Sequence, residues 1–252
     1  MQDEVIFGIN AVTEALRGKR RAFELFVGPQ PHDRRLSALV ELAAEKGVQI
    51  RQRQKQDLAR LSGSEYHQGV VLRVEPFPYA DLEELSGTWK EQTAAGVVLV
   101  LDSVQDPGNL GSLVRSAACA GVLGIVIPKD RAAAVTPAVE RVSAGAVETI
   151  PIARVTNIVH ALELLKGAGF WVYGLDHASP QALFQQDLLG RVALVVGSEG
   201  EGIRPLVRKN CDLLLSIPLQ GGVGSLNAAV AGSIAIFEVL RQRLQAGRGY
   251  AE

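Results

Sequence analysis

Cysteine, aromatic residues and long apolar runs are all scarce in this chain of 252 residues. The two cysteines, Cys119 and Cys211, form no CxxC pair and stand at no Cys/His metal spacing, so we expect buried, reduced thiols and no metal site. No apolar stretch approaches the roughly 20 residues of a membrane span, and the opening MQDEVIFGIN has early acids and no signal-peptide run. The sequence therefore predicts a cytoplasmic protein that does not insert into a membrane.

A strong net charge is also absent, because 26 basic and 27 acidic residues leave a formal net charge of −1 at pH 7. No overall field would attract nucleic acid, so such binding would depend on local patches. Residues 1–75 hold 12 basic and 10 acidic residues, and the basic ones gather in two clusters: Arg17, Lys19, Arg20 and Arg21, then Arg51, Arg53, Lys55 and Arg60. Such flexible cations suit RNA phosphates, although an ordinary solvated surface has the same composition.

What remains is an ordinary globular composition, 47% hydrophobic and 21% charged, in a chain long enough for one large domain or two smaller ones. Residues 1–75 have the pattern of a small α/β unit, with helical spacing at Ile9, Val12 and Leu16 and further elements at 23–28, 33–46 and 70–75. Residues 76–95 contain two prolines and few aliphatic residues, which is typical of a linker. Residues 96–252 would then form a second domain.

From Gly96 onward, short apolar strands alternate with helical segments. The predicted strands are 97–102, 123–128, 148–152, 170–176, 192–197 and 213–218. The last predicted helix covers 226–243, with one apolar face formed by Leu226, Val230, Ile234, Phe237 and Val239. This alternation predicts an α/β fold whose mainly parallel sheet is flanked by helices. Ligands of such sheets bind at the carboxyl ends of the strands, where the polar and glycine residues of this sequence gather.

Three loops at those strand ends carry the candidate chemistry: 102–117 with Asn109 and Arg115, 197–204 with Glu199, and 219–227 with Ser225 and Asn227 after three glycines. Glycines let backbone amides approach a ligand, although a glycine cluster is also common in simple turns. Arg115 could equally form a structural salt bridge with Glu199. No loop completes GxxxxGK[ST] or GxGxxG, which argues against a P-loop nucleotidase and a dinucleotide oxidoreductase.

These same loops carry a family resemblance. The segments LDSVQDPGNLGSLVRSA, LVVGSEGEGIRPLVRKNCD and IPLQGGVGSLNAAVAGSIAIFE resemble, in order and spacing, the three motifs of the SpoU (TrmH-like, SPOUT superfamily) RNA ribose 2′-O-methyltransferases. The segments FGINAVTEAL, HQGVV and VIPKDRAAAVTPAVERVSAGAVETIPIARVTNI extend the likeness over nearly the whole chain. They are similar to the subgroup that methylates a guanosine of 23S ribosomal RNA.

The resemblance implies S-adenosylmethionine as methyl donor, a trefoil knot near the C-terminus, a homodimer joined through the catalytic domain, and an RNA-binding N-terminal domain like ribosomal protein L30e. A knot would be an exception to the rule that chains do not thread loops. The implied catalytic residues are Asn109, Arg115, Glu199, Ser225 and Asn227. The implied cofactor-binding residues are Leu175, Gly197, Ile217 and Leu226, and the expected RNA contacts are Arg20, Arg21, Arg51, Arg53 and His67.

The role of Arg115 follows from its chemistry, since a guanidinium keeps its proton at physiological pH. We expect Arg115 to stabilise the developing alkoxide of the ribose, or to act as a base only if deep burial removed its proton. The sequence departs from the family pattern at Gly224, where we expect serine, and at Ala228 and Ala229, where we expect valine and serine. A transfer RNA methyltransferase, a non-catalytic RNA-binding or ribosome-assembly protein and a small-molecule nucleotide-binding enzyme therefore remain alternatives.

Overall fold

The computed structural model describes residues 3–29, 34–91, 95–222 and 224–247. The chain forms two compact units. The N-terminal unit consists of Met1–Pro78 together with Val135–Thr149, and the C-terminal unit consists of Tyr79–Ala134 together with Ile150–Glu252. The division differs from the expected one, because residues 135–149 belong with the N-terminal part of the chain.

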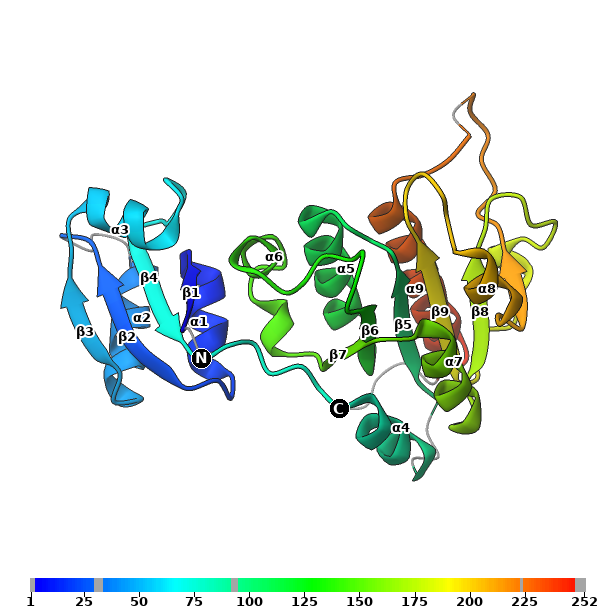
Figure 1. Ribbon diagram of the computed structural model, residues 1–252, viewed down its shortest axis with the longest axis horizontal. Helices are drawn as coiled ribbons and strands as arrows, with labels where there is room; N and C mark the ends of the chain where they lie inside the picture. Colours follow the sequence, from blue (N-terminus) through cyan, green and yellow to red (C-terminus); the bar gives the residue numbers. More distant parts are fainter. Residues whose placement is uncertain (1–2, 30–33, 92–94, 223, 248–252) are drawn as a thin grey trace. The chain divides into compact units, whose positions relative to one another are not determined.

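The N-terminal unit is a four-stranded sheet covered by helices (Figure 1). The sheet has the order β1-β4-β2-β3, in which β4 runs antiparallel to both neighbours and β2 runs parallel to β3. The predicted apolar stripe of the first helix, Ile9, Val12 and Leu16, is buried in the core of this unit. Its elements are β1 (Glu4–Phe7), α1 (Ile9–Arg17), β2 (Ala22–Val27), α2 (Arg34–Glu45), β3 (Gln49–Gln52), α3 (Lys55–Ser62), β4 (Val70–Val74), α6 (Pro137–Val142) and the 3₁₀ helix η1 (Ala146–Glu148).

A buried ion cluster holds α6 and η1 against the rest of the N-terminal unit. One nitrogen of Arg20, Nη1, lies 2.7 Å from Glu140 and 2.9 Å from Glu148, while Nη2 lies 2.6 Å from Glu4. The side chain of Arg20 is 1% exposed, so its guanidinium is not available to a phosphate. The expectation that Arg20 contacts RNA is therefore corrected: this arginine joins parts of the unit that are distant in sequence.

The strand expected at 148–152 is also wrong. Residues 146–148 form the 3₁₀ helix η1, and the strand begins only at Ile152. Gly145 precedes η1 with a left-handed backbone (φ 86°), and a Cβ there would lie 2.6 Å from the Cβ of Glu14. The close approach to α1 and the pairing of Glu148 with Arg20 draw this segment onto the N-terminal unit.

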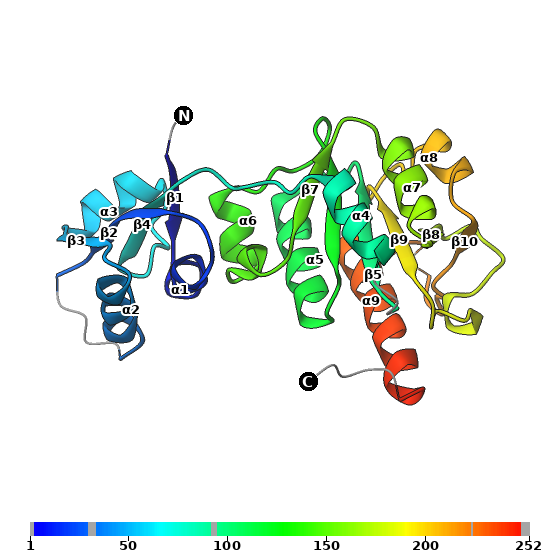
Figure 2. The ribbon, with the colours of Figure 1, turned by 90° about the horizontal axis from the view of Figure 1, so that it is seen from below.

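The C-terminal unit contains a six-stranded sheet in which every strand pair is parallel. The strand order is β10-β8-β9-β5-β6-β7. Figure 2 shows α4 and α7 on one side of this sheet and α5 and α9 on the other. The elements are α4 (Leu82–Glu91), β5 (Val97–Asp102), α5 (Pro107–Cys119), β6 (Gly124–Pro128), β7 (Ile152–Val155), α7 (Ile158–Gly167), β8 (Trp171–Leu175), η2 (Leu183–Gln185), β9 (Val192–Gly197), α8 (Pro205–Lys209), β10 (Leu213–Leu215) and α9 (Ala228–Gln245).

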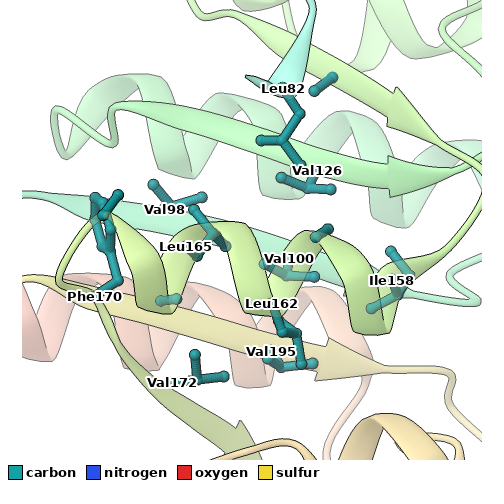
Figure 3. Packing of buried hydrophobic residues seen from close by; sticks show 14 of the residues in the cluster. Leu82, Val98, Val100, Val126, Ile158, Leu162, Leu165, Phe170, Val172 and Val195 are labelled. Atoms are coloured by element: carbon teal, nitrogen blue, oxygen red, sulfur yellow. The ribbon is translucent and has the colours of Figure 1, made fainter. Parts of the chain in front are cut away.

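One hydrophobic core of this unit lies under α4 and α7. Figure 3 shows Leu162 and Leu165 of α7 over Val98, Val100 and Val195 of the sheet. Successive residues of a strand point to opposite faces, so Leu99 and Leu101 of β5 face α5 and α9. Both faces are covered, which explains why β5 and β9 are continuous apolar runs and why their predicted bounds agree with the structure.

The linker expected at 76–95 is largely a packed helix. Leu82 and Trp89 of α4 are buried in the same core as Val98, and the ring of Trp89 meets Phe170 edge-on at 5.8 Å between centroids. Residues 92–94 of that expected linker lie outside the described residues, as does Asp33, the first residue of the helix expected at 33–46. The buried apolar side chains of Leu82 and Trp89 make α4 part of the C-terminal unit.

Helix α9 buries a face that shares only Val239 with the expected one among its fully buried residues. Val230 and Phe237 are 46% and 45% exposed, whereas the buried face is formed by the small residues Ala228, Ala229, Gly232 and Ala235 with Ile236 and Val239. A Cβ at Gly232 would lie 2.5 Å from Leu113 of α5, so α9 needs small residues in order to approach α5 and β9 closely.

The cysteine expectation holds only in part. Cys211 is partly buried, and its burial raises the pKa of the thiol to about 12. Cys119, at the end of α5, is exposed. Within the described residues, no helix combines the length and the apolar character that crossing a membrane requires.

Candidate active site

A cavity of about 420 Å³ lies at the carboxyl edge of the C-terminal sheet. The last residues of three strands line it, Leu175 of β8, Gly197 of β9 and Leu215 of β10. The loops that follow β9 and β10 complete its wall. This is the position at which parallel sheets bind ligands, and it is where the sequence placed the site.

The four residues expected to hold a cofactor all line this cavity: Leu175, Gly197, Ile217 and Leu226. Leu219 adds to the apolar wall, while Asp176 and Glu201 supply carboxylates. Asp176 is paired with Arg208 at 2.7 Å, and both line the cavity. The cavity thus combines an apolar slot with charged groups and the bare backbone of several glycines.

Gly197 allows the chain to fold back tightly after β9. Ser198 and Gly202 exchange two backbone hydrogen bonds of 3.0 Å, and this small bridge lies directly over Gly197. A Cβ at residue 197 would stand 2.1 Å from the carbonyl carbon of Gly202. Since the obstructing atoms belong to the backbone, no side-chain rotation would relieve the overlap.

We expect Gly197→Ala to weaken cofactor binding at least tenfold and to destabilise the unit by about 1–3 kcal/mol, because the loop must move away from β9. Gly200→Ala is the matched control, since a Cβ at residue 200 of the same loop meets nothing within 4 Å. Calorimetric titration with S-adenosylmethionine and urea unfolding would measure both effects. Equal binding by the two variants would show that the tight turn is not needed.

A buried ion pair anchors the same loop. Asp102 ends β5 and is fully buried, and it accepts hydrogen bonds from the backbone N–H of Arg204 at 2.8 Å and from its Nε at 2.7 Å. The pairing of Asp102 with Arg204 was not predicted from the sequence, where residue 102 marked only the start of a loop. The available signal was a carboxylate directly after a five-residue apolar run, which must find a partner when the strand is buried.

Three of the predicted catalytic residues come together from three different loops. The Nδ2 of Asn109 donates to Oε1 of Glu199 at 2.9 Å, and the Nδ2 of Asn227 donates to Oδ1 of Asn109 at 2.9 Å. Asn227 also donates from Nδ2 to Oε1 of Glu199. Their sequence separations are 90, 118 and 28 residues, so only the fold brings them together.

Helix caps place the two asparagines of this cluster, and the cap at α9 also orients the side-chain amide of Asn227. Asn227 is the N-cap of α9, and its Oδ1 accepts from the N–H groups of Ala229 and Val230 at 2.9 and 3.1 Å. With Oδ1 held by the helix, the Nδ2 group must face Glu199. Asp106 caps α5 by accepting from the N–H of Asn109 at 2.8 Å. Glu199 thus accepts from both amides.

Ser225 and Arg115 are placed differently. Ser225 is exposed and lines the cavity. Arg115 is exposed on α5, is absent from the cavity wall, and has no hydrogen bond or ion pair with any other described residue. The alternative of a structural salt bridge with Glu199 is therefore not formed. The structure unites Asn109, Glu199 and Asn227 and leaves the guanidinium of Arg115 unengaged.

The expected RNA contacts of the N-terminal unit are likewise divided. Arg21, Arg51 and Arg53 are exposed, and Arg51 lies 2.8 Å from Glu24. His67 is only 2% exposed, and its Nδ1 accepts from the N–H of Gly69 at 3.0 Å. His67 therefore lies in the wall of a second cavity and not on the outer surface, and its expected contact with RNA stays a prediction.

Comparison with known proteins agrees with this geometry. A family model described as SpoU rRNA Methylase matches residues 96–237, and one described as RNA 2′-O ribose methyltransferase substrate binding matches residues 5–80. The chain belongs to the SpoU rRNA methylase family. It is 40% identical over 246 residues to the 23S rRNA (guanosine-2′-O-)-methyltransferase RlmB of Xanthomonas campestris pv. campestris, covering 97% of this chain and 99% of that protein.

One further sequence relative and one solved structure support this assignment. An uncharacterised tRNA/rRNA methyltransferase of Synechocystis sp. is 39% identical over 241 residues, and the chain spans 63% of the length of that protein. The SpoU methyltransferase AviRb from Streptomyces viridochromogenes, solved in complex with AdoMet, has a TM-score of 0.81 at 25% identity, over 96% of this chain and 91% of AviRb. The expected enzyme class, an RNA 2′-O-methyltransferase, and the expected parallel α/β fold are both confirmed.

The cavity of this SpoU protein suits its cofactor, S-adenosylmethionine. An apolar wall of Leu215, Ile217 and Leu226 can hold a flat base, and exposed glycine backbone offers donors and acceptors to its edge. The carboxylates of Glu199 and Glu201 face the same space and favour a positively charged sulfonium and ammonium. The residues present therefore fit the cofactor in size, polarity and charge.

Proposed function

We propose that this protein methylates the ribose 2′-hydroxyl of a guanosine in 23S ribosomal RNA, in the cytoplasm. The convergence of Asn109, Glu199 and Asn227 at the edge of the cofactor cavity is the observation that carries the proposal. The RlmB relative, aligned over nearly the whole of both chains, supports the guanosine and the 23S RNA as target. A transfer RNA target remains the second candidate, because other relatives are named tRNA/rRNA methyltransferases.

The chemistry divides among residues of this chain. When bound, S-adenosylmethionine supplies an electrophilic methyl group on a sulfonium. The 2′-oxygen must be aligned with that methyl and must lose its proton as the new bond forms. Arg115 is exposed and unpaired among described residues, so its fixed positive charge can meet the alkoxide that develops on the ribose.

Glu199 acts in this proposal as a positioning residue for the two amides. Its Oε1 accepts from both Asn109 and Asn227, which leaves Oε2 as an acceptor without a partner among the described residues. A ribose hydroxyl beside the cavity could donate to that acceptor. Ser225, at the rim, supplies a further hydroxyl that can donate or accept.

The N-terminal unit is, in this proposal, an L30e-like domain that binds RNA. Its four-stranded sheet with helices and the match of residues 5–80 to a substrate-binding model support this role. Arg21, Arg51 and Arg53 remain the proposed phosphate contacts, since all three are exposed on or beside β2 and β3.

A trefoil knot in residues 192–240 is also proposed. It is supported by the likeness to SpoU structures and by the adjacent courses of the 198–204 and 216–227 segments around one cavity. Pulling a single molecule from its two ends would test it. A knotted chain should stop short of its full contour length of roughly 3.6 Å per residue, whereas an unknotted chain should reach it.

The proposed homodimer has a candidate surface on α9. Val230, Phe237 and Leu244 follow one another at a spacing of seven residues and are 46%, 45% and 39% exposed. This spacing places them on one face of the helix, where they form an apolar stripe. We propose that a second copy of the chain covers this stripe.

We expect Phe237→Asp to convert the dimer to monomers, because the substitution would bury a charge in the interface. Phe184→Asp is the control, since Phe184 is 49% exposed but belongs to η2 rather than α9. Sedimentation velocity would measure the mass of each variant. A wild-type monomer, or a Phe237→Asp dimer as stable as the wild type, would contradict the proposed interface.

The target is tested by transferring labelled methyl groups from S-adenosylmethionine to 23S and transfer RNA in vitro, and by mapping the modified ribose. We expect one modified guanosine in 23S RNA and none in transfer RNA. Modification of transfer RNA alone would favour the second candidate. Cofactor binding with no transfer to either RNA would contradict the proposed function.

A further inference from the structure

The N-terminal unit contains a cavity of its own, with a volume of about 770 Å³. The turn between β1 and α1, the loop 65–69, the start of α3 and helix α6 all contribute to its wall. The polar residues that matter here are Lys55, Tyr66, His67, Gln68 and Arg141. A volume of this size falls within the range of small-molecule sites.

His67 offers an unused donor in the wall of this cavity. Its Nδ1 accepts a hydrogen bond from the N–H of Gly69 at 3.0 Å, so the proton of the neutral ring must be on Nε2. The residue is 2% exposed, and its buried Nε2 makes no hydrogen bond of good geometry in the described part of the chain, although the backbone of Lys55 is close enough to act on the ring. Burial also lowers the pKa of His67, which favours this neutral form. A ligand acceptor would satisfy the N–H.

The same wall is suited to an anion. Lys55 and Arg141 place two cations on it, against the single carboxylate of Glu65 among the described lining residues. The first turn of α1 contributes Asn10 and Ala11 to the wall, while the N–H of Ile9 is already held by Gln68. The dipole of a helix start favours a phosphate beside that turn.

A flat surface stands at the edge of the cavity. Tyr66 is 73% exposed, and the guanidinium carbon of Arg141 lies 5.9 Å from the centre of its ring. Unpaired bases stack on both tyrosine rings and guanidinium planes. Gln68, which holds the start of α1 by accepting from the N–H of Ile9 at 2.8 Å, keeps this loop in place.

We propose that this cavity binds one unstacked nucleotide of the RNA substrate. Lys55, Arg141 and the start of α1 take its phosphate, Tyr66 takes the face of its base, and Nε2 of His67 donates to an acceptor on the base edge. The inference rests on the proposed function, since it assumes an RNA substrate. The inference adds Arg141 to the RNA-binding surface of the N-terminal unit. Arg141 belongs to that unit although it lies in the range matched by the SpoU rRNA Methylase model.

Two variants of the full chain test the cavity through different signatures. Arg141→Ala should weaken binding of a 23S RNA transcript and lower the slope of log affinity against log salt by about 1, because one phosphate contact is lost. Tyr66→Ala should weaken binding about tenfold or more without changing that slope, because stacking is not ionic. Tyr66→Phe should restore binding.

Lys46→Ala is the matched control, since Lys46 is an exposed cation of the same unit that follows α2 and does not line the cavity. Each variant is also titrated with S-adenosylmethionine, whose binding should not change. Ultraviolet crosslinking of the transcript should attach a nucleotide to Tyr66. Affinities of both cavity variants within twofold of the wild type, beside normal methylation, would overturn this inference alone. A wild-type protein that neither binds nor methylates RNA would overturn the proposed function and this inference together.

Discussion

Replacing Arg20 with alanine should destabilise the N-terminal unit by about 3–5 kcal/mol, because it leaves carboxylates buried without their partner. Glu140 and Glu148 have side chains that are 3% and 5% exposed, and both depend on the one guanidinium. Hydrogen exchange of amides in β1 and β4 would report on this unit. Tryptophan fluorescence would report on the C-terminal unit, since Trp89 and Trp171 both belong to it.

The size of this effect should depend on pH. Burial raises the pKa of Glu140 from 4.5 to about 8 and also raises that of Glu148, although Arg20 opposes both shifts. A carboxyl group that holds its proton in the folded state and releases it when unfolded makes folding less favourable as pH rises between those two values. The contribution of Glu140 to the stability of the N-terminal unit should therefore fall as pH rises from about 4.5 to 8, and Glu140→Gln should remove this contribution.

Controls separate the buried cluster from ordinary surface charge. Arg17→Ala removes an arginine that is 64% exposed and paired only with Glu14 in the same helix, so its effect should stay within about 0.5 kcal/mol. Arg20→Met combined with Glu140→Gln and Glu148→Gln should recover much of the lost stability. If Arg20→Ala cost no more than Arg17→Ala at pH 7, the cluster would not hold the unit together.

Replacing Arg115 with alanine should lower kcat about 100- to 1,000-fold, as the loss of one fixed electrostatic contact to a developing anion does in other enzymes. Binding of S-adenosylmethionine should not change, because Arg115 does not line its cavity. Arg115→Lys keeps the charge but loses the planar fork, so an intermediate rate is expected. Single-turnover methylation of the RNA would measure the chemical step.

Lys209→Ala provides the comparison, because Lys209 is an exposed cation of α8 that does not line the cavity. Its removal should leave kcat within about twofold of the wild type, as expected for a solvated surface charge. Near-wild-type turnover by Arg115→Lys, with the cofactor still bound, would show that the guanidinium is unnecessary. A rate loss in Arg115→Ala that disappeared at saturating RNA would instead assign Arg115 to substrate binding.

The sequence predicts an element correctly where its local apolar pattern matches the burial of that element in the fold. β5 and β9 are buried on both faces, so their apolar runs marked both ends correctly. The strand predicted at 148–152 was wrong, because Glu148 pairs with Arg20, which is 128 residues away. Local periodicity contains no information on such distant pairs. For the same reason the apolar residues of α9 indicated a largely different face, since close packing there selects small side chains.

The candidate site was visible through its loops. Glycines and polar residues after apolar strands pointed to the carboxyl edge, and the family resemblance named the residues that now lie on one cavity or in one amide cluster. Asp102 and Arg204 were missed because their pairing needs the fold. Arg20 and Arg21 are adjacent in sequence, yet one is buried and the other exposed, so composition could not separate a structural arginine from a surface one.

Because residues 135–149 pack in the N-terminal unit, they limit how domains can be recombined between members of this family. In a hybrid joined once near residue 78, Arg20 and Glu4 would come from one parent and Glu140 and Glu148 from the other. The buried carboxyl groups would then pack against residues of a different parent. Recombination between relatives should succeed only where both pieces travel together. Among functional hybrids, the residue at position 20 should therefore correlate with those at positions 140 and 148 more strongly than with any residue of the catalytic loops.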